Sequence, residues 1–208
     1  MLASLRRLYR RARFGEPIIV VSGLPRSGTS MLMKMLEAGG VPLVTDGLRE
    51  ADEDNPKGYY EDERVKRLGQ ETDRGWLASA RGKGIKVISY LLRSLPSDFN
   101  YRVIFLKREI EEVLASQKKM LARRREKDDS PPERMRALFE DDLWRASYLL
   151  RHAPQFETLE VRYADVVARP LEQALRVAEF LGARLDVEAM AAVVDPQLYR
   201  NRATQRPQ

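Results

Sequence analysis

Short apolar runs alternate along this chain with longer segments in which apolar residues recur every three or four positions. Residues 17–21 (PIIVV) form a continuous β-branched run, which is typical of a strand buried on both faces of a sheet. Further short apolar runs at 85–89, 102–106 and 158–161 predict three more strands. Strands that alternate with helical segments predict an α/β fold with a mainly parallel sheet flanked by helices.

The helical segments are rich in helix-forming residues, and several of them stop at a glycine. They cover residues 29–38, 109–125, 135–151, 171–181 and 187–194. Residues 127–132 (KDDSPP) are polar and contain two prolines, which predicts a loop.

The chain length of 208 residues is that of one domain. We expect a single α/β domain over residues 17–202, preceded by a basic segment at 1–16 and followed by a tail at 203–208. Residues 2–13 contain five arginines, and Leu2, Leu5, Leu8 and Tyr9 share one stripe of a possible helix. That stripe would either dock on an anionic membrane surface or pack against the domain.

Composition narrows the classes of function. The chain has no cysteine, which excludes thiol catalysis and Cys-ligated zinc. Its single histidine, His152, leaves almost no material for a histidine metal cluster or a Ser-His-Asp triad. No apolar run approaches the roughly 20 residues that a bilayer span needs, and the first residues lack the apolar core of a secretory signal, so we expect a cytoplasmic protein. The net charge of +6 indicates an anionic partner: nucleic acid, a membrane surface or a phosphorylated small molecule.

The segment Ser22–Ser30 (SGLPRSGTS) lies between a predicted strand and a predicted helix. Glycines at 23 and 28 permit a tight turn, and the helix N-terminus behind it supplies backbone N–H donors for a phosphate-like anion. The spacing resembles a Walker A loop, but Thr29 stands where the lysine should be, and the cation is Arg26, inside the loop. This departure weakens an ATPase interpretation. The alternative is a glycine-rich turn that binds nothing.

A second pair of polar residues follows the strand at 102–106. Arg108 comes directly after the strand, and Ser116 lies about two helical turns further on. Because ligands bind at the carboxyl edge of a parallel sheet, this pair predicts a second anion site near the first. The alternatives are an ion pair between Arg108 and Glu111 or Glu112, and a neutral helical Ser116. Two separate anion sites indicate a nucleotide phosphorylated at both its 5′ and 3′ positions.

With these elements the sequence resembles the sulfotransferase family that uses 3′-phosphoadenosine 5′-phosphosulfate (PAPS). GLPRSGTS is similar to the family's 5′-phosphosulfate loop, and FLKREIEEVLAS is similar to its 3′-phosphate element, although residues 109–111 replace the usual Asn/Asp-Pro-x. VRYADVVARPLEQALRVAEFLG resembles a third family segment. The resemblance implies a P-loop nucleoside-triphosphatase-like fold and sulfuryl transfer from PAPS to a hydroxyl or amine without a metal. It implies a small-molecule, carbohydrate or peptide acceptor.

The resemblance also implies roles for individual residues. Residues that match the donor-binding motifs are Pro25, Arg26, Ser27, Gly28, Thr29 and Ser30 for the 5′ end, Arg108 and Ser116 for the 3′ phosphate, and Tyr163 for the adenosine. Arg200 or Arg202 would close the 3′-phosphate site from a basic C-terminal loop, or else belong to an exposed basic tail.

The acceptor's proton must go to a base, and the sequence favours a carboxylate. His152 ends a helix far along the chain from both anion sites, where interaction with the last carbonyls explains it. NPKGYYE (residues 55–61) resembles a segment of bacterial sulfotransferase-like sequences, so we select Glu61; the alternative is a Glu61 that only opens a helix. Asp46 and Glu50 are the reserve candidates.

Two basic residues complete the predicted catalytic set. Lys86 lies inside an apolar strand, and burying a lone ammonium is costly, so we expect an anionic partner or an edge strand from which the side chain reaches water. By family resemblance Lys86 lies near the transferred sulfuryl group, where Arg26 would also act. The rival interpretations are a P-loop nucleotide or small-molecule kinase and a non-catalytic binder of anionic ligands; nucleic acid is the less favoured ligand.

Overall fold

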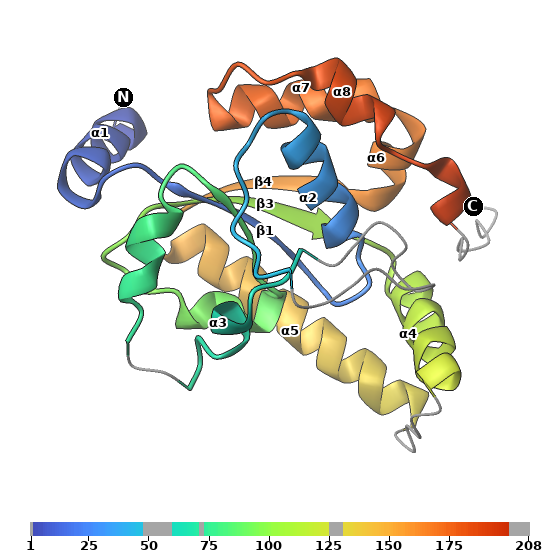
Figure 1. Ribbon diagram of the computed structural model, residues 1–208. Helices are drawn as coiled ribbons and strands as arrows, with labels where there is room; N and C mark the ends of the chain where they lie inside the picture. Colours follow the sequence, from blue (N-terminus) through green and yellow to red (C-terminus); the bar gives the residue numbers. More distant parts are fainter. Residues whose placement is uncertain (1, 48–59, 71–72, 125–130, 200–208) are drawn as a thin grey trace.

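The sheet at the centre of the molecule is entirely parallel. The computed structural model describes residues 2–47, 60–70, 73–124 and 131–199. Within these ranges the strand order is β2-β1-β3-β4, which confirms the predicted α/β fold (Figure 1). The strands are β1 (Ile18–Gly23), β2 (Gly84–Lys86), β3 (Tyr101–Lys107) and β4 (Phe156–Arg162).

Helices cover both faces of this sheet and extend beyond its edges (Figure 1). The α-helices are α1 (Leu2–Phe14), α2 (Thr29–Ala38), α3 (Glu63–Lys66), α4 (Ile110–Arg124), α5 (Pro132–His152), α6 (Tyr163–Ala168), α7 (Pro170–Leu181) and α8 (Val187–Ala192). The described residues also form the 3₁₀ helices η1 (Gly75–Ala80), η2 (Ser89–Ser94) and η3 (Pro196–Leu198). Among the described residues, no helix combines the length and apolarity that crossing a bilayer requires.

The core is divided by the sheet into two halves, because successive side chains of a strand point to opposite faces. Val20 and Val103 pack with η1, η2 and α5 on one side. Val21 and Ile104 pack with α2, α6, α7 and α8 on the other. Both faces are therefore buried, as the β-branched run at 17–21 predicts.

Two glycines shape the loop that follows β1. A Cβ on Gly23 would lie 2.5 Å from the carbonyl oxygen of Leu106, so only glycine lets this loop pass the end of β3. Gly28 has φ of +101°, and a Cβ there would lie 2.5 Å from the ring of Tyr163. The loop thus fits closely between β3 and α6, and α2 begins directly behind it.

Some expected boundaries were wrong. The run at 85–89 forms a strand only over Gly84–Lys86, and Ser89 already begins η2. Helix α5 begins at Pro132, which belongs to the predicted proline loop, because a proline at the first helical position needs no hydrogen-bonded N–H. The short helix α6, directly after β4, was not predicted.

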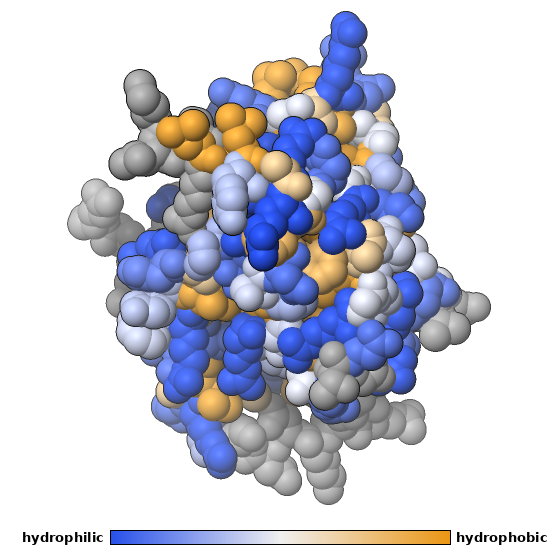
Figure 2. Space-filling model, turned by 90° about the vertical axis from the view of Figure 1, so that its left-hand side faces the viewer, coloured by the Kyte–Doolittle hydropathy of each residue, from blue (hydrophilic) through white to orange (hydrophobic). Residues whose placement is uncertain are grey.

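Helix α1 lies to one side of the sheet, and Figure 2 shows the molecule from that side. The surface in this view is mainly hydrophilic, and hydrophobic side chains come through it in several places. The site described next lies at the other end of the strands.

Candidate functional site

The loop between β1 and α2 has the geometry of an anion cradle. Gly28 is the N-cap of α2, and the first turn of an α-helix leaves N–H groups without intrahelical partners. Arg26, inside the loop, has φ of +65°, a left-handed conformation that is uncommon for a residue with a side chain. Backbone strain of this kind is concentrated at ligand sites, so the loop has the local signature of one.

Two buried hydroxyls of the same segment have no hydrogen-bond partner among the residues that the structure describes. They are Ser22 Oγ and Ser27 Oγ. A buried hydroxyl without a partner costs free energy, which an incoming acceptor can recover. Ser27 also lines a cavity of about 600 Å³, together with Leu24, Arg108 and Tyr199. Ser27 therefore places a hydroxyl without a described partner in the wall of this cavity.

Arg108 is held by contacts on several sides. Its Nε donates to Glu112 Oε2 at 2.9 Å, and its Nη1 donates to the carbonyl of Arg26 at 3.2 Å. The guanidinium also lies over the ring of Tyr163, 4.3 Å from its centroid, and 5.4 Å from the centroid of Tyr199. The side chains of Arg108 and Glu112 are only 7% and 3% exposed, so this ion pair is buried.

Tyr199, near the end of the described chain, reaches the same carboxylate. Its hydroxyl donates to the other oxygen, Glu112 Oε1, at 2.7 Å. Burial and this hydrogen bond raise the pKa of Tyr199 to about 12, so the phenol is protonated and donates at neutral pH. Glu112 thus joins the segment after α8 to the arginine at the end of β3.

The loop between β1 and α2 directly contacts the segment from Arg108, just after β3, to Ser116 in α4, which we call the β3–α4 element. Arg26 Nε donates to Ser116 Oγ at 3.1 Å, while the carbonyl of the same residue accepts from Arg108. The two predicted anion sites are therefore adjacent at one edge of the sheet. They are close enough for one ligand to contact both.

Tyr163, the residue predicted to contact the adenosine, begins α6 and lies beside Gly28 and Arg108. The structure therefore brings Tyr163 to the same edge as Arg26, Ser27 and Ser116. Arg200 and Arg202 lie outside the described residues, and so does Glu50.

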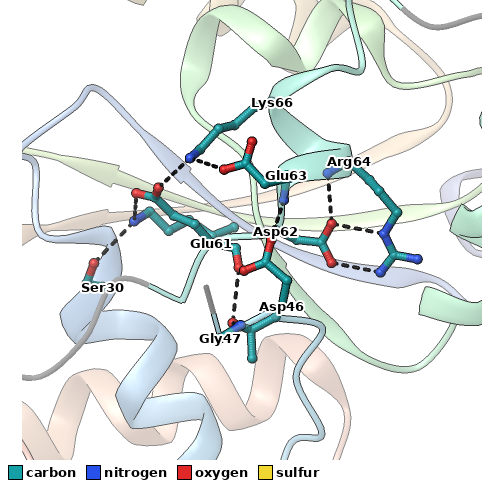
Figure 3. A network of polar contacts seen from close by, with 10 residues as sticks. Ser30, Asp46, Gly47, Glu61, Asp62, Glu63, Arg64 and Lys66 are labelled. Carbon is teal, nitrogen blue, oxygen red and sulfur yellow. Dashed lines mark hydrogen bonds and ion pairs between the residues drawn. The ribbon is translucent and has the colours of Figure 1, made fainter. Parts of the chain in front are cut away.

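A second polar cluster surrounds Glu61, near Ser30 in the first turn of α2 (Figure 3). Its Oε1 lies 3.2 Å from Lys86 Nζ, and its Oε2 lies 3.2 Å from Lys66 Nζ. Lys86 Nζ also donates to Ser30 Oγ, in the first turn of α2, at 3.3 Å. Lys86 therefore has an anionic partner, and Lys86 itself connects that partner to the anion cradle through Ser30.

Glu61 does not open a helix, so that alternative was wrong. Asp62 is the N-cap of α3 and accepts from Arg64 N, and the helix begins at Glu63. Asp46, a reserve candidate for the base, accepts from the backbone N–H of Glu63 at 2.7 Å. Asp46 and Asp62 thus hold the start of α3, and only Glu61 of the three contacts Lys86.

Sequence reasoning missed two contributors, and it named a third in only one of its roles. Lys66 lies near Glu61 because the one-turn helix α3 turns the chain back toward it. Tyr199 lies near Glu112 because α8 and the segment after it pack against the domain. Glu112 was named as an ion-pair partner of Arg108, and the structure confirms that ion pair. The ion pair was treated as an alternative to a ligand site, but an arginine that pairs with Glu112 can still contact a ligand. The spacing of four residues from Arg108 to Glu112 was the available signal. His152 Nδ1 lies 2.8 Å from the carbonyl oxygen of Tyr148, in the last turn of α5, which confirms the helix-end interpretation of this residue.

Comparisons with known proteins identify the family and a similar fold. The family model described as "Sulfotransferase domain" matches residues 16–202. The solved structure of the sulfotransferase domain from the curacin biosynthetic pathway is similar in fold, with a TM-score of 0.57 and 15% identity over 92% of this chain and 93% of that chain. A sulfotransferase from Alicyclobacillus acidocaldarius has a TM-score of 0.47 and 14% identity over 81% of each chain, which adds no argument. A search of the curated proteins gave no match. From the extent of the family match, this chain belongs to the sulfotransferase family.

Proposed function

We propose that this protein transfers the sulfuryl group of PAPS to a hydroxyl or amine of an acceptor and releases adenosine 3′,5′-bisphosphate. The observation that carries the proposal is the direct contact between the loop and the β3–α4 element, in which Arg26 bonds Ser116 and Arg108 bonds Arg26. A nucleotide with phosphates at both ends needs two anion sites side by side.

The 5′ end of the donor fits the loop. Backbone N–H groups at the start of α2 would bind the 5′-phosphosulfate, and Ser27 would donate its unsatisfied hydroxyl. Ser30 and Lys86 lie at the side of the loop that faces Glu61. Positive charge at that point would stabilise the oxygen that leaves with the 5′ phosphate.

The 3′ phosphate fits the Arg108 side of the site. Arginine presents a planar fork of donors that matches a phosphate, and Glu112 with the two tyrosine rings fixes the plane of that fork. A phosphate bound there would replace two existing contacts, that of Arg108 with the carbonyl of Arg26 and that of Arg26 with Ser116. The side chains released in this way would contact the phosphate oxygens instead. The buried position strengthens such charge-assisted contacts.

The transfer itself needs one proton acceptor. The acceptor's oxygen would form a bond to sulfur while the bond from sulfur to the 5′-phosphate oxygen breaks, and the hydroxyl proton would pass to Glu61. Lys66 is exposed and is shared between Glu61 and Glu63, so it can move off Glu61 as the acceptor arrives. Lys86 would remain beside the leaving oxygen, and no metal is needed in this scheme.

Thermal-shift titration of the whole chain tests the proposal against its rivals. Adenosine 3′,5′-bisphosphate without metal should raise the unfolding temperature, because a ligand that binds only the folded state stabilises it. ATP with Mg²⁺ should have less effect, and so should a short oligonucleotide. A larger shift with ATP and Mg²⁺ would favour the kinase, and a larger, salt-sensitive shift with the oligonucleotide would favour the non-catalytic binder. Either result would contradict the proposal.

A further inference from the structure

Helix α1 is fixed to the domain by polar contacts. Arg10 Nε donates to Asn100 Oδ1 at 2.9 Å, and its Nη2 donates to the carbonyls of Ser97 and Phe99 at 2.8 Å each. Asn100 returns two hydrogen bonds, to the carbonyls of Arg10 and Gly15. The helix therefore has a defined orientation, set by a reciprocal network just before β3.

Two more contacts attach the same side of the helix. Arg7 Nε lies 3.3 Å from Glu157 Oε1 on β4, and Arg81 Nε donates to the carbonyl of Phe14 at 3.0 Å. Asn100 and Glu157 both belong to the amino-terminal end of the sheet. Figure 1 shows α1 on that side, while the arrowhead of β3 points away from it toward α4.

The opposite side of α1 is apolar and faces solvent. Leu5, Leu8 and Tyr9 are 58%, 65% and 63% exposed, and at 100° per residue they form one stripe with the exposed Ala12. An amphipathic helix on a globular domain normally buries its apolar stripe and exposes its charges. Here the arrangement is reversed, because Arg7 and Arg10 contact the domain while Leu5 and Leu8 face outward.

The charges beside this stripe indicate what covers it. Residues 2–14 contain five arginines and no acidic residue. Arg11 and Arg13 are exposed and lie at the two borders of the stripe, and Arg11 pairs with Glu16. A second copy docked on this stripe would bring arginine against arginine. An anionic lipid surface, in contrast, supplies a negative layer for the arginines and an apolar layer for the leucines.

We propose that α1 docks this protein onto an anionic membrane surface, with Leu5, Leu8 and Tyr9 entering the interface and the bordering arginines contacting lipid headgroups. The inference does not depend on the proposed reaction. It does set the orientation of the site, because α1 lies at the amino-terminal end of the strands and Arg26 and Arg108 lie beyond the carboxyl ends. On a membrane, the site would face the water.

Co-sedimentation of the full chain with vesicles tests this docking. Vesicles of phosphatidylcholine with phosphatidylserine should bind the protein, and vesicles of phosphatidylcholine alone should bind it much less. The double substitution Leu5→Ser and Leu8→Ser should weaken binding roughly tenfold or more, because the buried apolar area drives insertion. The matched control is Leu171→Ser with Leu175→Ser on α7, whose side chains are 45% and 53% exposed; it should bind like the wild type. High salt should weaken wild-type binding.

A second readout does not rely on the leucine variants. In the Tyr9→Trp variant, the new indole contributes fluorescence that is obtained by subtracting the wild-type spectrum. This emission should shift to the blue when phosphatidylserine vesicles are added, since the indole enters the interface. Three outcomes would overturn the proposal: no binding to anionic vesicles, equal losses in the α1 and α7 variants, or a concentration-dependent dimer that the Leu5 and Leu8 substitutions abolish. The dimer would assign the stripe to a second copy of the chain.

Discussion

At the scale of the residue, the site consists of charged side chains that already neutralise one another. Arg108 is paired with Glu112, and Glu61 lies between two lysines. These groups are thus oriented before any ligand arrives, which reduces the reorganisation that the reaction requires. The two clusters differ in one respect: Arg108 and Glu112 are buried together, whereas Lys66 beside Glu61 is exposed.

Replacing Glu61 by Gln should separate binding from turnover. The amide keeps the size of the side chain but cannot take the acceptor's proton, so release of adenosine 3′,5′-bisphosphate from PAPS should fall by about 10²- to 10⁴-fold, with donor affinity largely retained. Product release with a mixture of hydroxyl acceptors gives the rate, and calorimetry gives the affinity.

Glu63→Gln is the matched control, because Glu63 also pairs with Lys66 but does not contact Lys86. It should keep its turnover. If Glu61→Gln were as active as Glu63→Gln, Glu61 would not be the base.

Replacing Glu112 should damage both the fold and the 3′ end of the site. Removing one partner of a buried ion pair costs about 3–5 kcal/mol of folding free energy, because the remaining charge is left without compensation. For Glu112→Gln we expect a lower unfolding temperature and weaker binding of adenosine 3′,5′-bisphosphate, while AMP, which has no 3′ phosphate, should lose less.

The control for this substitution lies next to it. Glu111 forms an exposed ion pair with Arg136, and such pairs contribute about 0–1 kcal/mol, so Glu111→Gln should change neither property measurably. Equal effects of the two substitutions would show that Glu112 does not orient Arg108.

At the scale of the element, the glycine loop depends on its fit between β3 and α6. Its backbone passes the Leu106 carbonyl at Gly23 and the Tyr163 ring at Gly28. The strand before the loop and the helix behind it follow from the sequence, since hydrophobic pattern and glycine spacing are local properties. The elements that pack against the loop, β3 and α6, cannot be deduced from the local sequence, because they are distant from the loop in the chain.

A pair of glycine substitutions measures this fit. Gly28 and Gly40 both have positive φ, +101° and +92°, but a Cβ on Gly40 meets nothing within 4 Å. Gly40→Ala should therefore cost only the roughly 1–2 kcal/mol of the left-handed backbone. Gly28→Ala should cost more, because the methyl group displaces Tyr163, and it should also weaken binding of adenosine 3′,5′-bisphosphate.

Chemical denaturation gives both free energies of unfolding. Equal costs at the two positions would mean that the ring of Tyr163 moves aside freely and that the close contact has no role in shaping the loop.

Neighbouring elements of similar composition were the hardest to separate from the sequence. The run from Ile85 to Leu92 is apolar except for Lys86 and Ser89, yet it forms the end of β2 and then η2, because both places bury apolar residues and a short run has no readable period. The pairing of Arg108 with Ser116 was readable, since Arg108 directly follows β3 and Ser116 lies eight residues later in the next helix, α4. The approach of Tyr199 to Glu112 and of Lys66 to Glu61 was not, since each needs a turn of chain packed by other elements.

At the scale of the whole molecule, the two ends of the sheet have different roles. The carboxyl ends of the strands gather Arg26, Arg108 and Lys86, and the amino-terminal end carries α1. Parallel strands make this division, because all of their carboxyl ends meet at one edge. The protein would then bind its nucleotide at one end and a surface at the other without interference.

The central claim is that one nucleotide spans the loop and the β3–α4 element. Calorimetric titration with adenosine 3′,5′-bisphosphate, AMP and adenosine 3′-monophosphate tests it most directly, in the wild type and in Arg108→Ala. We expect the bisphosphate to bind the wild type at least roughly a hundredfold more tightly than either monophosphate, since two charge-assisted contacts act together. Arg108→Ala should remove this advantage and leave AMP unaffected. If AMP bound the wild type as tightly as the bisphosphate, the two sites would not be acting on one ligand, and the account would be wrong.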